Sequence, residues 1–302
     1  MRDVLGKLIS QWMEQDENVL FLAADIGGGL FKPLKSIFPD RVINVGIAEQ
    51  NMIGMAAGFT SLGFRVICYS KACFVSLRVA DQIKNALCYA QNNVIIIAAD
   101  SGYDEANAGY AHIALEDLGI IRSLAGINVY VPTTITGMRE CFRDAMESAY
   151  PSYIRMNKEK VCETEGAFRK IERGLYYLKE SQLHKTLMVT HGISAKYALA
   201  WSEKRIESCS VIAVDSFQKI DSALQREMKR YEQIIVFEEQ FKRNGLYQFV
   251  EELVLEGKIS TIQLFRIGPE TVYKKVCFDR ASKVCEEIAD CIVPSDQQQW
   301  RK

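Results

Sequence analysis

The chain has almost no net charge, few histidines and no closely spaced cysteine pair. Its 37 Lys and Arg residues are balanced by 38 Asp and Glu residues, so the formal net charge is −1. Because nucleic-acid-binding proteins carry a basic patch or arm, this balance predicts no nucleic-acid partner. The nine cysteines include no pair with Cys-x-x-Cys spacing, and there are only three histidines. Scattered thiols are typical of a reducing compartment, so we expect structural cysteines, no zinc site and a cytoplasmic protein.

Long hydrophobic runs are also missing. The longest apolar stretches, Val19–Ala24 and Val94–Ala99, are far shorter than the roughly 20 residues that cross a bilayer. At the N-terminus Leu5, Leu8 and Ile9 follow the spacing of an amphipathic helix, unlike the continuous apolar core of a signal peptide. We therefore expect neither a membrane partner nor a secretion signal.

Short β-rich runs alternate with helical patterns along the chain. In the first half we expect strands at Val19–Ala24, Arg41–Val45, Arg65–Tyr69, Val94–Ala99, Asn128–Val131 and Tyr153–Met156. The intervening helices are expected near 30–38, 49–62, 76–91, 113–125 and 135–149. The strands are continuous apolar runs, which is typical of a parallel sheet whose two faces are both covered by helices.

The same alternation restarts after a charged stretch. Strands are expected at Thr186–Thr190, Val211–Asp215, Ile234–Phe237 and Thr261–Phe265, with helices near 194–208, 219–231 and 243–257. The pattern predicts two α/β/α domains, at 1–158 and 175–302, joined by a linker at 159–174.

The segment Ile43-Asn-Val-Gly-Ile-Ala-Glu-Gln-Asn-Met52 places Glu49 between a predicted strand and a predicted helix. An acid in the first turn of a helix lies near the positive end of the helix dipole. The helix contains Gly54 and Gly58, which allow another element to approach closely. A carboxyl group held there and covered by a partner surface has the environment of a tuned hydrogen-bonding acid.

This segment, with Phe-Pro-Asp-Arg before it and Gly-Met-Ala-Ala-Gly-Phe-Thr after it, resembles the pyrimidine-binding domain of transketolases and 1-deoxyxylulose-5-phosphate synthases. In that family the matching glutamate bonds N1′ of thiamine diphosphate, which makes Glu49 the expected catalytic and cofactor-binding acid. The resemblance also implies that Phe74 stacks on the pyrimidine ring. Asp25 and Ile26, in Ala-Ala-Asp-Ile, match the element that holds the cofactor's bent form.

His112 lies in the loop that follows the strand ending before Asp100. Ligands of parallel sheets bind outside the carboxyl ends of the strands, which is where this loop is expected. The sequence His-Ile-Ala-Leu-Glu-Asp-Leu-Gly resembles the family's substrate-facing histidine element, so His112 is the candidate for proton transfer and hydroxyl binding. By the same resemblance Arg155 grips a sugar phosphate and Asp100 binds substrate.

Several positions depart from the family pattern. Ala108 stands where the family has an Asp that binds a donor hydroxyl, and Lys71 replaces an aromatic residue. Ser101 follows Asp100 where deoxyxylulose synthases have a phosphate-binding Arg. These differences predict altered substrate recognition. The helix with Arg78, Asp81 and Gln82 matches the family well, and we assign those three residues mainly to packing and the subunit interface.

The family's metal-binding element, Gly-Asp-Gly followed by Asn, does not occur in the sequence. In the family that element holds Mg²⁺ and the diphosphate, and it belongs to a separate N-terminal domain. The resemblance therefore implies a split enzyme. We expect thiamine diphosphate as cofactor, Mg²⁺ ligands from an N-terminal transketolase subunit, and a heterotetramer of two copies of each chain.

The expected activity is transfer of a two-carbon ketol unit between a ketose and an aldose, with phosphorylated or otherwise anionic sugars as substrates. Alternatives are a deoxyxylulose-synthase-like activity on pyruvate, suggested by Asp100, and the β subunit of a 2-oxo-acid dehydrogenase. A non-catalytic assembly or regulatory subunit is a further alternative, motivated by Lys71 and Ala108.

Overall fold

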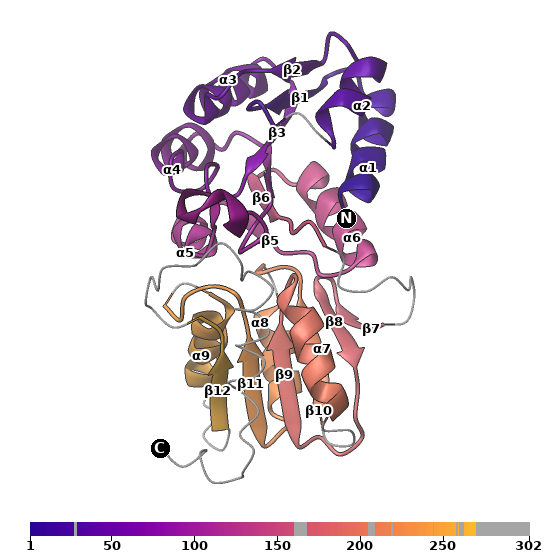
Figure 1. Ribbon diagram of the computed structural model, residues 1–302, viewed down its shortest axis with the longest axis vertical. Coiled ribbons are helices and arrows are strands. Elements are labelled where there is room, and N and C mark those ends of the chain that lie inside the picture. The colour runs from indigo at the N-terminus through magenta and orange to yellow at the C-terminus, as the bar shows by residue number, and fades with distance from the viewer. Residues whose placement is uncertain are drawn as a thin grey trace.

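The computed structural model describes residues 1–26, 29–159, 168–204, 209–218, 220–243, 245–257, 259 and 263–269. They form two α/β units, one above the other in Figure 1, each built around its own sheet. The first unit contains β1 to β6 and the second contains β7 to β12. The predicted two-domain α/β architecture is therefore confirmed.

The first sheet has six parallel strands in the order β2-β1-β3-β4-β6-β5. Its strands are β1 (Val19–Ala23), β2 (Val42–Asn44), β3 (Arg65–Lys71), β4 (Val94–Ala99), β5 (Asn128–Tyr130) and β6 (Ser152–Arg155). Every residue of β1 and β4 is buried, as expected for strands covered on both faces.

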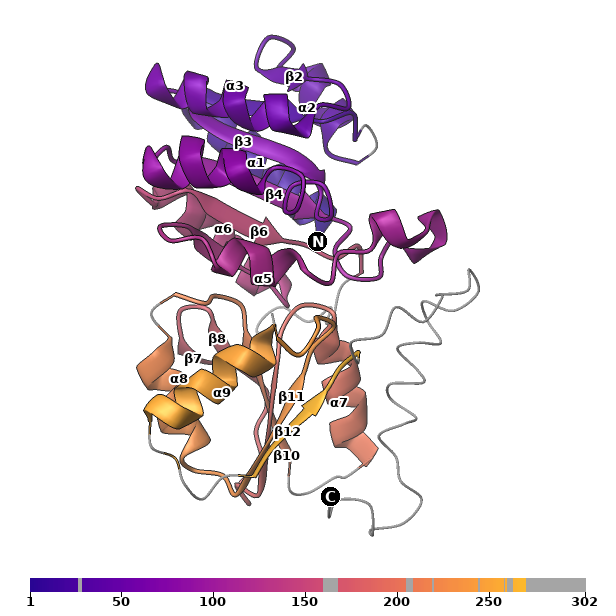
Figure 2. The same cartoon turned by 90° about the vertical axis from the view of Figure 1, so that its left-hand side faces the viewer.

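Helices cover both faces of this sheet. One face carries α1 (Arg2–Gln15), α2 (Phe31–Ile37) and α6 (Ile135–Glu147), which share one apolar core. The other carries α3 (Glu49–Ser61), α4 (Ala80–Gln82), which runs into a π-helix (Ile83–Tyr89), and α5 (Asp117–Arg122). Figure 2 views the molecule from the side of these last helices.

The second sheet has the order β12-β11-β9-β10-β8-β7. Its strands are β7 (Arg169–Glu172), β8 (Leu175–Lys179), β9 (Thr186–Thr190), β10 (Cys209–Val214), β11 (Gln233–Phe237) and β12 (Gln263–Ile267). Strands β9 to β12 are parallel, and β8 and β7 are antiparallel additions at one edge. Helices α8 (Asp221–Met228) and α9 (Leu246–Glu256) share an apolar core on one face, and α7 (Ser194–Lys204) covers the other.

Two segments differ from their local predictions. Of the expected linker at 159–174, residues 160–167 lie outside the described residues, and 169–172 form β7, an exposed edge strand whose charged residues hide its β character. The helix expected over 76–91 begins only at Ala80. In the preceding turns the Lys71 carbonyl accepts from the N–H groups of Phe74 and Val75, and the Ser76 hydroxyl donates to the Ala72 carbonyl at 2.7 Å. None of the helices in the described ranges is long and apolar enough to cross a membrane.

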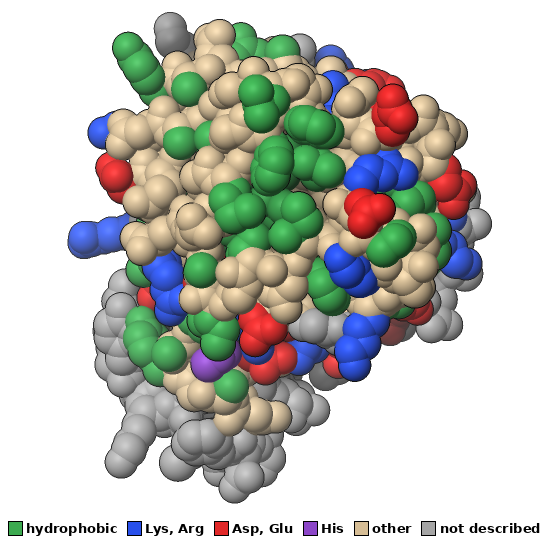
Figure 3. Space-filling view, turned by 90° about the horizontal axis from the view of Figure 1, so that it is seen from above, with side chains coloured by type: hydrophobic (Ala, Val, Ile, Leu, Met, Phe, Trp, Pro, Cys, Tyr) green, Lys and Arg blue, Asp and Glu red, His purple; other side chains and the backbone are tan. Residues whose placement is uncertain are grey.

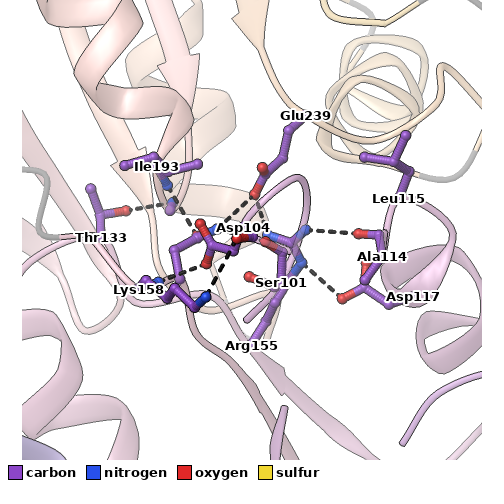
Figure 4. A network of polar contacts seen from close by, with 12 residues as sticks. Ser101, Asp104, Ala114, Leu115, Asp117, Thr133, Arg155, Lys158, Ile193 and Glu239 are labelled. Atoms are coloured by element: carbon purple, nitrogen blue, oxygen red, sulfur yellow. Dashed lines mark hydrogen bonds and ion pairs between the residues drawn. The ribbon is translucent and has the colours of Figure 1, made fainter. Parts of the chain in front are cut away.

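A buried ion-pair network joins the two units (Figure 4). Arg155, at the end of β6, is 0% exposed. Its Nε donates to Asp117 Oδ2 at 2.8 Å, and its Nη1 donates to Glu239 Oε1, beyond β11 in the second unit, at 2.5 Å. Burial alone lowers the pKa of Arg155, but the charges of Asp117 and Glu239 outweigh it and raise that pKa, so the guanidinium stays ionised.

The Arg155→Met substitution should lower the free energy of unfolding by about 3–5 kcal/mol, because it leaves two buried carboxylates without their cation. Urea denaturation measures this loss. Arg169→Met is the matched control, since its pair with Glu180 is exposed and should be worth less than about 1 kcal/mol. Equal losses from the two substitutions would contradict the role given to Arg155.

Candidate active site

In the first sheet, the side on which the next strand is added reverses at β1. This reversal creates a site at the carboxyl edge of the sheet. Strand β1 pairs with β2 on one side and with β3 on the other. The chain therefore runs from β1 to β2 in one direction and then from β2 past β1 to β3 in the opposite direction. Ligands of parallel sheets bind at such a point, beyond the carboxyl ends of the strands. The segments that follow β1, β3 and β4 begin at this edge, and they carry the predicted residues Asp25, Phe74 and Asp100.

Glu49 is the first residue of α3, and its side chain is only 2% exposed. The carboxylate accepts from Arg78 Nη1 at 2.8 Å and from the Ser70 hydroxyl at 3.4 Å. The helix dipole favours negative charge at this position. The structure therefore holds a paired, water-excluded carboxylate at the predicted position.

A chain of contacts links Glu49 through Arg78 to Phe74, and from Phe74 to His112. The Arg78 guanidinium lies over the Phe74 ring, with Cζ 4.4 Å from the ring centroid. The His112 ring meets Phe74 edge-on, with centroids 5.3 Å apart and planes inclined by 71°. His112 belongs to a short 3₁₀ helix, Tyr110–His112, and its Nδ1 atom is buried without a hydrogen-bond partner among the described residues. Four side chains from three segments thus form one cluster.

Arg78 is the member of this cluster for which the sequence predicts no role in the site. It was expected to serve packing and the subunit interface, yet its guanidinium pairs with Glu49 and covers Phe74. The one available signal was its spacing of four residues from Phe74, which is weak because it fits any helical or turn-rich segment.

Asp25 and Ile26 lie at the end of β1, and their contacts in the structure are with residues outside the cluster. Asp25 is exposed and adopts a left-handed backbone conformation, with φ 48°. Its carboxylate accepts from Asn44 Nδ2 at 3.0 Å, and its N–H donates to Asn44 Oδ1 at 3.1 Å. Ile26 is partly buried against the apolar core on the side of α1. The two residues therefore fix the chain where it leaves β1.

The structure does not bring the other two predicted substrate residues into this cluster. Asp100 is buried, and its Oδ1 accepts from Arg2 Nη2 at 2.7 Å. Arg155 is enclosed between the two units, where its donors are engaged by Asp117, Glu239 and the Ala114 carbonyl. In this structure each of these donors is engaged by a protein group, and binding of a sugar phosphate by Arg155 stays a prediction.

The cluster has the elements of an acid–base and aromatic binding site. Glu49 offers a buried carboxylate that can exchange a proton with a bound heterocycle, and Phe74 offers an apolar ring face. The unpartnered Nδ1 of His112 can donate to or accept from a substrate hydroxyl. Among the described residues, no group of His, Cys, Asp and Glu has the arrangement of a metal site.

The family profile that matches this chain and two of its relatives all carry transketolase names. The sequence profile of the family "Transketolase, pyrimidine binding domain" matches residues 1–164. A 6-deoxy-6-sulfo-D-fructose transketolase subunit, SqwH, of Clostridium sp. is 33% identical over 157 residues, which cover 52% of this chain and 49% of that protein. A putative transketolase C-terminal section of Methanocaldococcus jannaschii is 27% identical over 281 residues, 90% of this chain and 87% of that protein.

The fold comparison extends over nearly the whole chain. A solved structure described as a split gene transketolase, inactive beta4 tetramer, superposes with a TM-score of 0.80 at 27% identity, covering 96% of this chain and 92% of that one. The aligned region spans about half of the SqwH relative and most of the other two proteins. On this evidence the chain belongs to the transketolase family and carries that family's pyrimidine-binding domain.

Proposed function

We propose that this chain is the pyrimidine-binding subunit of a thiamine-diphosphate-dependent enzyme that transfers a two-carbon ketol unit from a ketose to an aldose. The observation that carries the proposal is the buried Glu49 carboxylate at the start of α3, held by Arg78 beside the Phe74 and His112 rings. We keep the predicted domains, 1–158 and 175–302, and extend the start of the second to include β7, which pairs with β8.

The residues present fit the aminopyrimidine half of thiamine diphosphate. Glu49 would bond the ring nitrogen N1′ and hold a proton there, and Phe74 would pack against the ring. When bound, the cofactor supplies the electron sink that ketol transfer requires. His112 would bind and orient a substrate hydroxyl through Nδ1, which has no partner in the described structure. Ile26 would limit the space at the end of β1.

The diphosphate half needs ligands from another chain. The sequence has no Gly-Asp-Gly element, and the described residues include no group arranged for a metal ion. We infer that a partner subunit supplies the Mg²⁺ and diphosphate site, and that two copies of each chain form a heterotetramer. The split-gene transketolase supports this inference, because its assembly of β chains is described as inactive.

The exposed face of α3 is the surface on which this partner would dock. Ile47 is 78% exposed and Leu77 is 51% exposed. A Cβ atom built on Gly54 or Gly58 would meet nothing within 4 Å, so this side of the helix is uncovered. Figure 3 shows hydrophobic side chains gathered on the face that is uppermost in Figure 1, where α3 lies. A flat, apolar surface next to Glu49 fits a partner that closes the site.

The Glu49→Gln substitution should reduce kcat of the assembled pair roughly 100-fold or more, because an amide keeps the shape of the carboxylate but cannot hold the proton. Ketol transfer from a ketose donor to an aldose acceptor is the measurement. Asp221→Asn is the matched control, since Asp221 is also an acid in the first turn of a helix but lies exposed in the second unit. Full activity of the Glu49→Gln pair would refute the proposed role.

The Gly54→Leu substitution should act in opposite directions on the chain and on the assembly. Removing a glycine from a helix stabilises the isolated chain by up to about 1 kcal/mol. The added side chain fills the uncovered face of α3, so association with the diphosphate-binding subunit should weaken at least roughly tenfold, which corresponds to 1.4 kcal/mol. Urea denaturation of the chain and sedimentation of the pair measure the two effects. Unchanged association would place the partner on another face.

A further inference from the structure

Two lysines at the edge of the site share one carboxylate. Lys71 ends β3, and its Nζ lies 3.3 Å from Glu105 Oε2. The other carboxylate oxygen, Oε1, accepts from the Lys158 ammonium, which follows β6. Lys71 is 23% exposed and Glu105 is 20% exposed, so the triad is partly shielded from water but remains accessible.

Within the triad two ammonium groups face a single carboxylate. Asp100, whose charge also acts on Lys158, is paired with Arg2. Asp104 lies close by, where its carboxylate accepts from the Lys158 N–H at 2.6 Å. Burial is the main cause that raises the pKa of Asp104 to about 7. In direct contact, therefore, Glu105 is the one carboxylate that both lysines share among the described residues.

The contacts of Glu105 are those of a counter-ion. Burial alone raises the pKa of Glu105, but the hydrogen bonds and charges of Lys158 and Lys71 outweigh it and lower that pKa. The same pairing raises the pKa of Lys158 against the effect of burial. Both shifts favour the ionised forms of Glu105 and Lys158, so an anionic ligand can replace the Glu105 carboxylate beside Lys158 as one negative charge for another.

The position of the triad is set by the same strand ends that build the active site. Lys71 pairs in register with Ala99, the residue before Asp100. Its carbonyl accepts from the Phe74 N–H at 2.9 Å, which starts the turn that carries Phe74. Glu105 precedes the 3₁₀ helix Ala106–Ala108, and His112 ends the next one. A sugar held at Phe74 and His112 can therefore extend along this loop toward the lysines.

We propose that Lys71 and Lys158 bind the anionic end of the sugar substrate, a tetrahedral oxyanion such as a phosphate ester or a sulfonate, and that Glu105 occupies this site when substrate is absent. This inference rests on the proposed function and names the substrate class of that site. Unlike Arg155, which is buried, both lysines are partly exposed. Ammonium groups suit the task, since each donates up to three hydrogen bonds.

The test compares acceptors that differ only in their anion. The assembled pair is assayed with D-glyceraldehyde, with D-glyceraldehyde 3-phosphate and with the analogue that carries a sulfonate in place of the phosphate. The readout is the ratio of kcat/KM for each anionic acceptor to that for the neutral one. In Lys71→Met and in Lys158→Met this ratio should fall roughly tenfold, because one charge-assisted contact is lost. The acceptor with the larger ratio in the wild-type pair identifies the anion.

Glu105→Gln separates this account from a purely structural triad. Removing the competing carboxylate should raise the ratio, whereas a loop that the triad merely holds together would lower activity with all acceptors in every variant. Lys170→Met, which breaks the exposed pair with Glu140, is the matched control and should leave the ratio unchanged. A ratio that is unaffected by the lysine substitutions, or that moves the same way in Glu105→Gln, would overturn the inference.

Failure of the proposed function would give a different result from failure of the anion site. A pair that turns over none of the acceptors would refute ketol transfer while leaving the anion site to be decided by binding. Inorganic phosphate titrated into the full chain should then bind more weakly to Lys71→Met and more tightly to Glu105→Gln. No difference between these variants and the wild-type chain would overturn the anion site as well.

Discussion

A carboxylate held out of water at the start of a helix is the constraint on which the site depends. Glu49 is almost fully buried, and Arg78 gives it its one close cation, at 2.8 Å. That guanidinium also lies over Phe74, whose ring meets His112. One ion pair therefore sets the positions of the acid, the aromatic face and the imidazole. Their separate segments follow β2, β3 and β4, and they reach a common edge because these strands are parallel.

Buried ion pairs also link the two units to the site. Arg155 ends β6, next to β4 in the sheet, and its guanidinium is neutralised by one acid from each unit, Asp117 and Glu239. The second unit thus contributes a counter-charge just below the carboxyl edge of the first. Arg155 therefore holds the two units together, while Lys71 and Lys158, the proposed anion-binding residues, are partly exposed.

The sequence could predict what depends on local pattern. Continuous apolar runs such as Val94–Ala99 identified the buried strands, and the segment around Glu49 identified the helix start and the family. Side-chain partners could not be predicted, because they depend on which strand ends become neighbours. No sequence pattern links Arg155 to its partner Glu239, which lies 84 residues later in the chain. Strand β7 was missed because its charged edge residues resemble a linker.

The central claim is that this chain holds half of a cofactor site. Calorimetric titration of thiamine diphosphate, in the presence of Mg²⁺, into this chain, into the diphosphate-binding subunit and into the assembled pair tests it most directly. The account predicts saturable binding by the pair and little or none by this chain alone, because Glu49 and Phe74 offer contacts to the pyrimidine only. Binding to this chain alone with the affinity of the pair, or no binding by the pair, would contradict it.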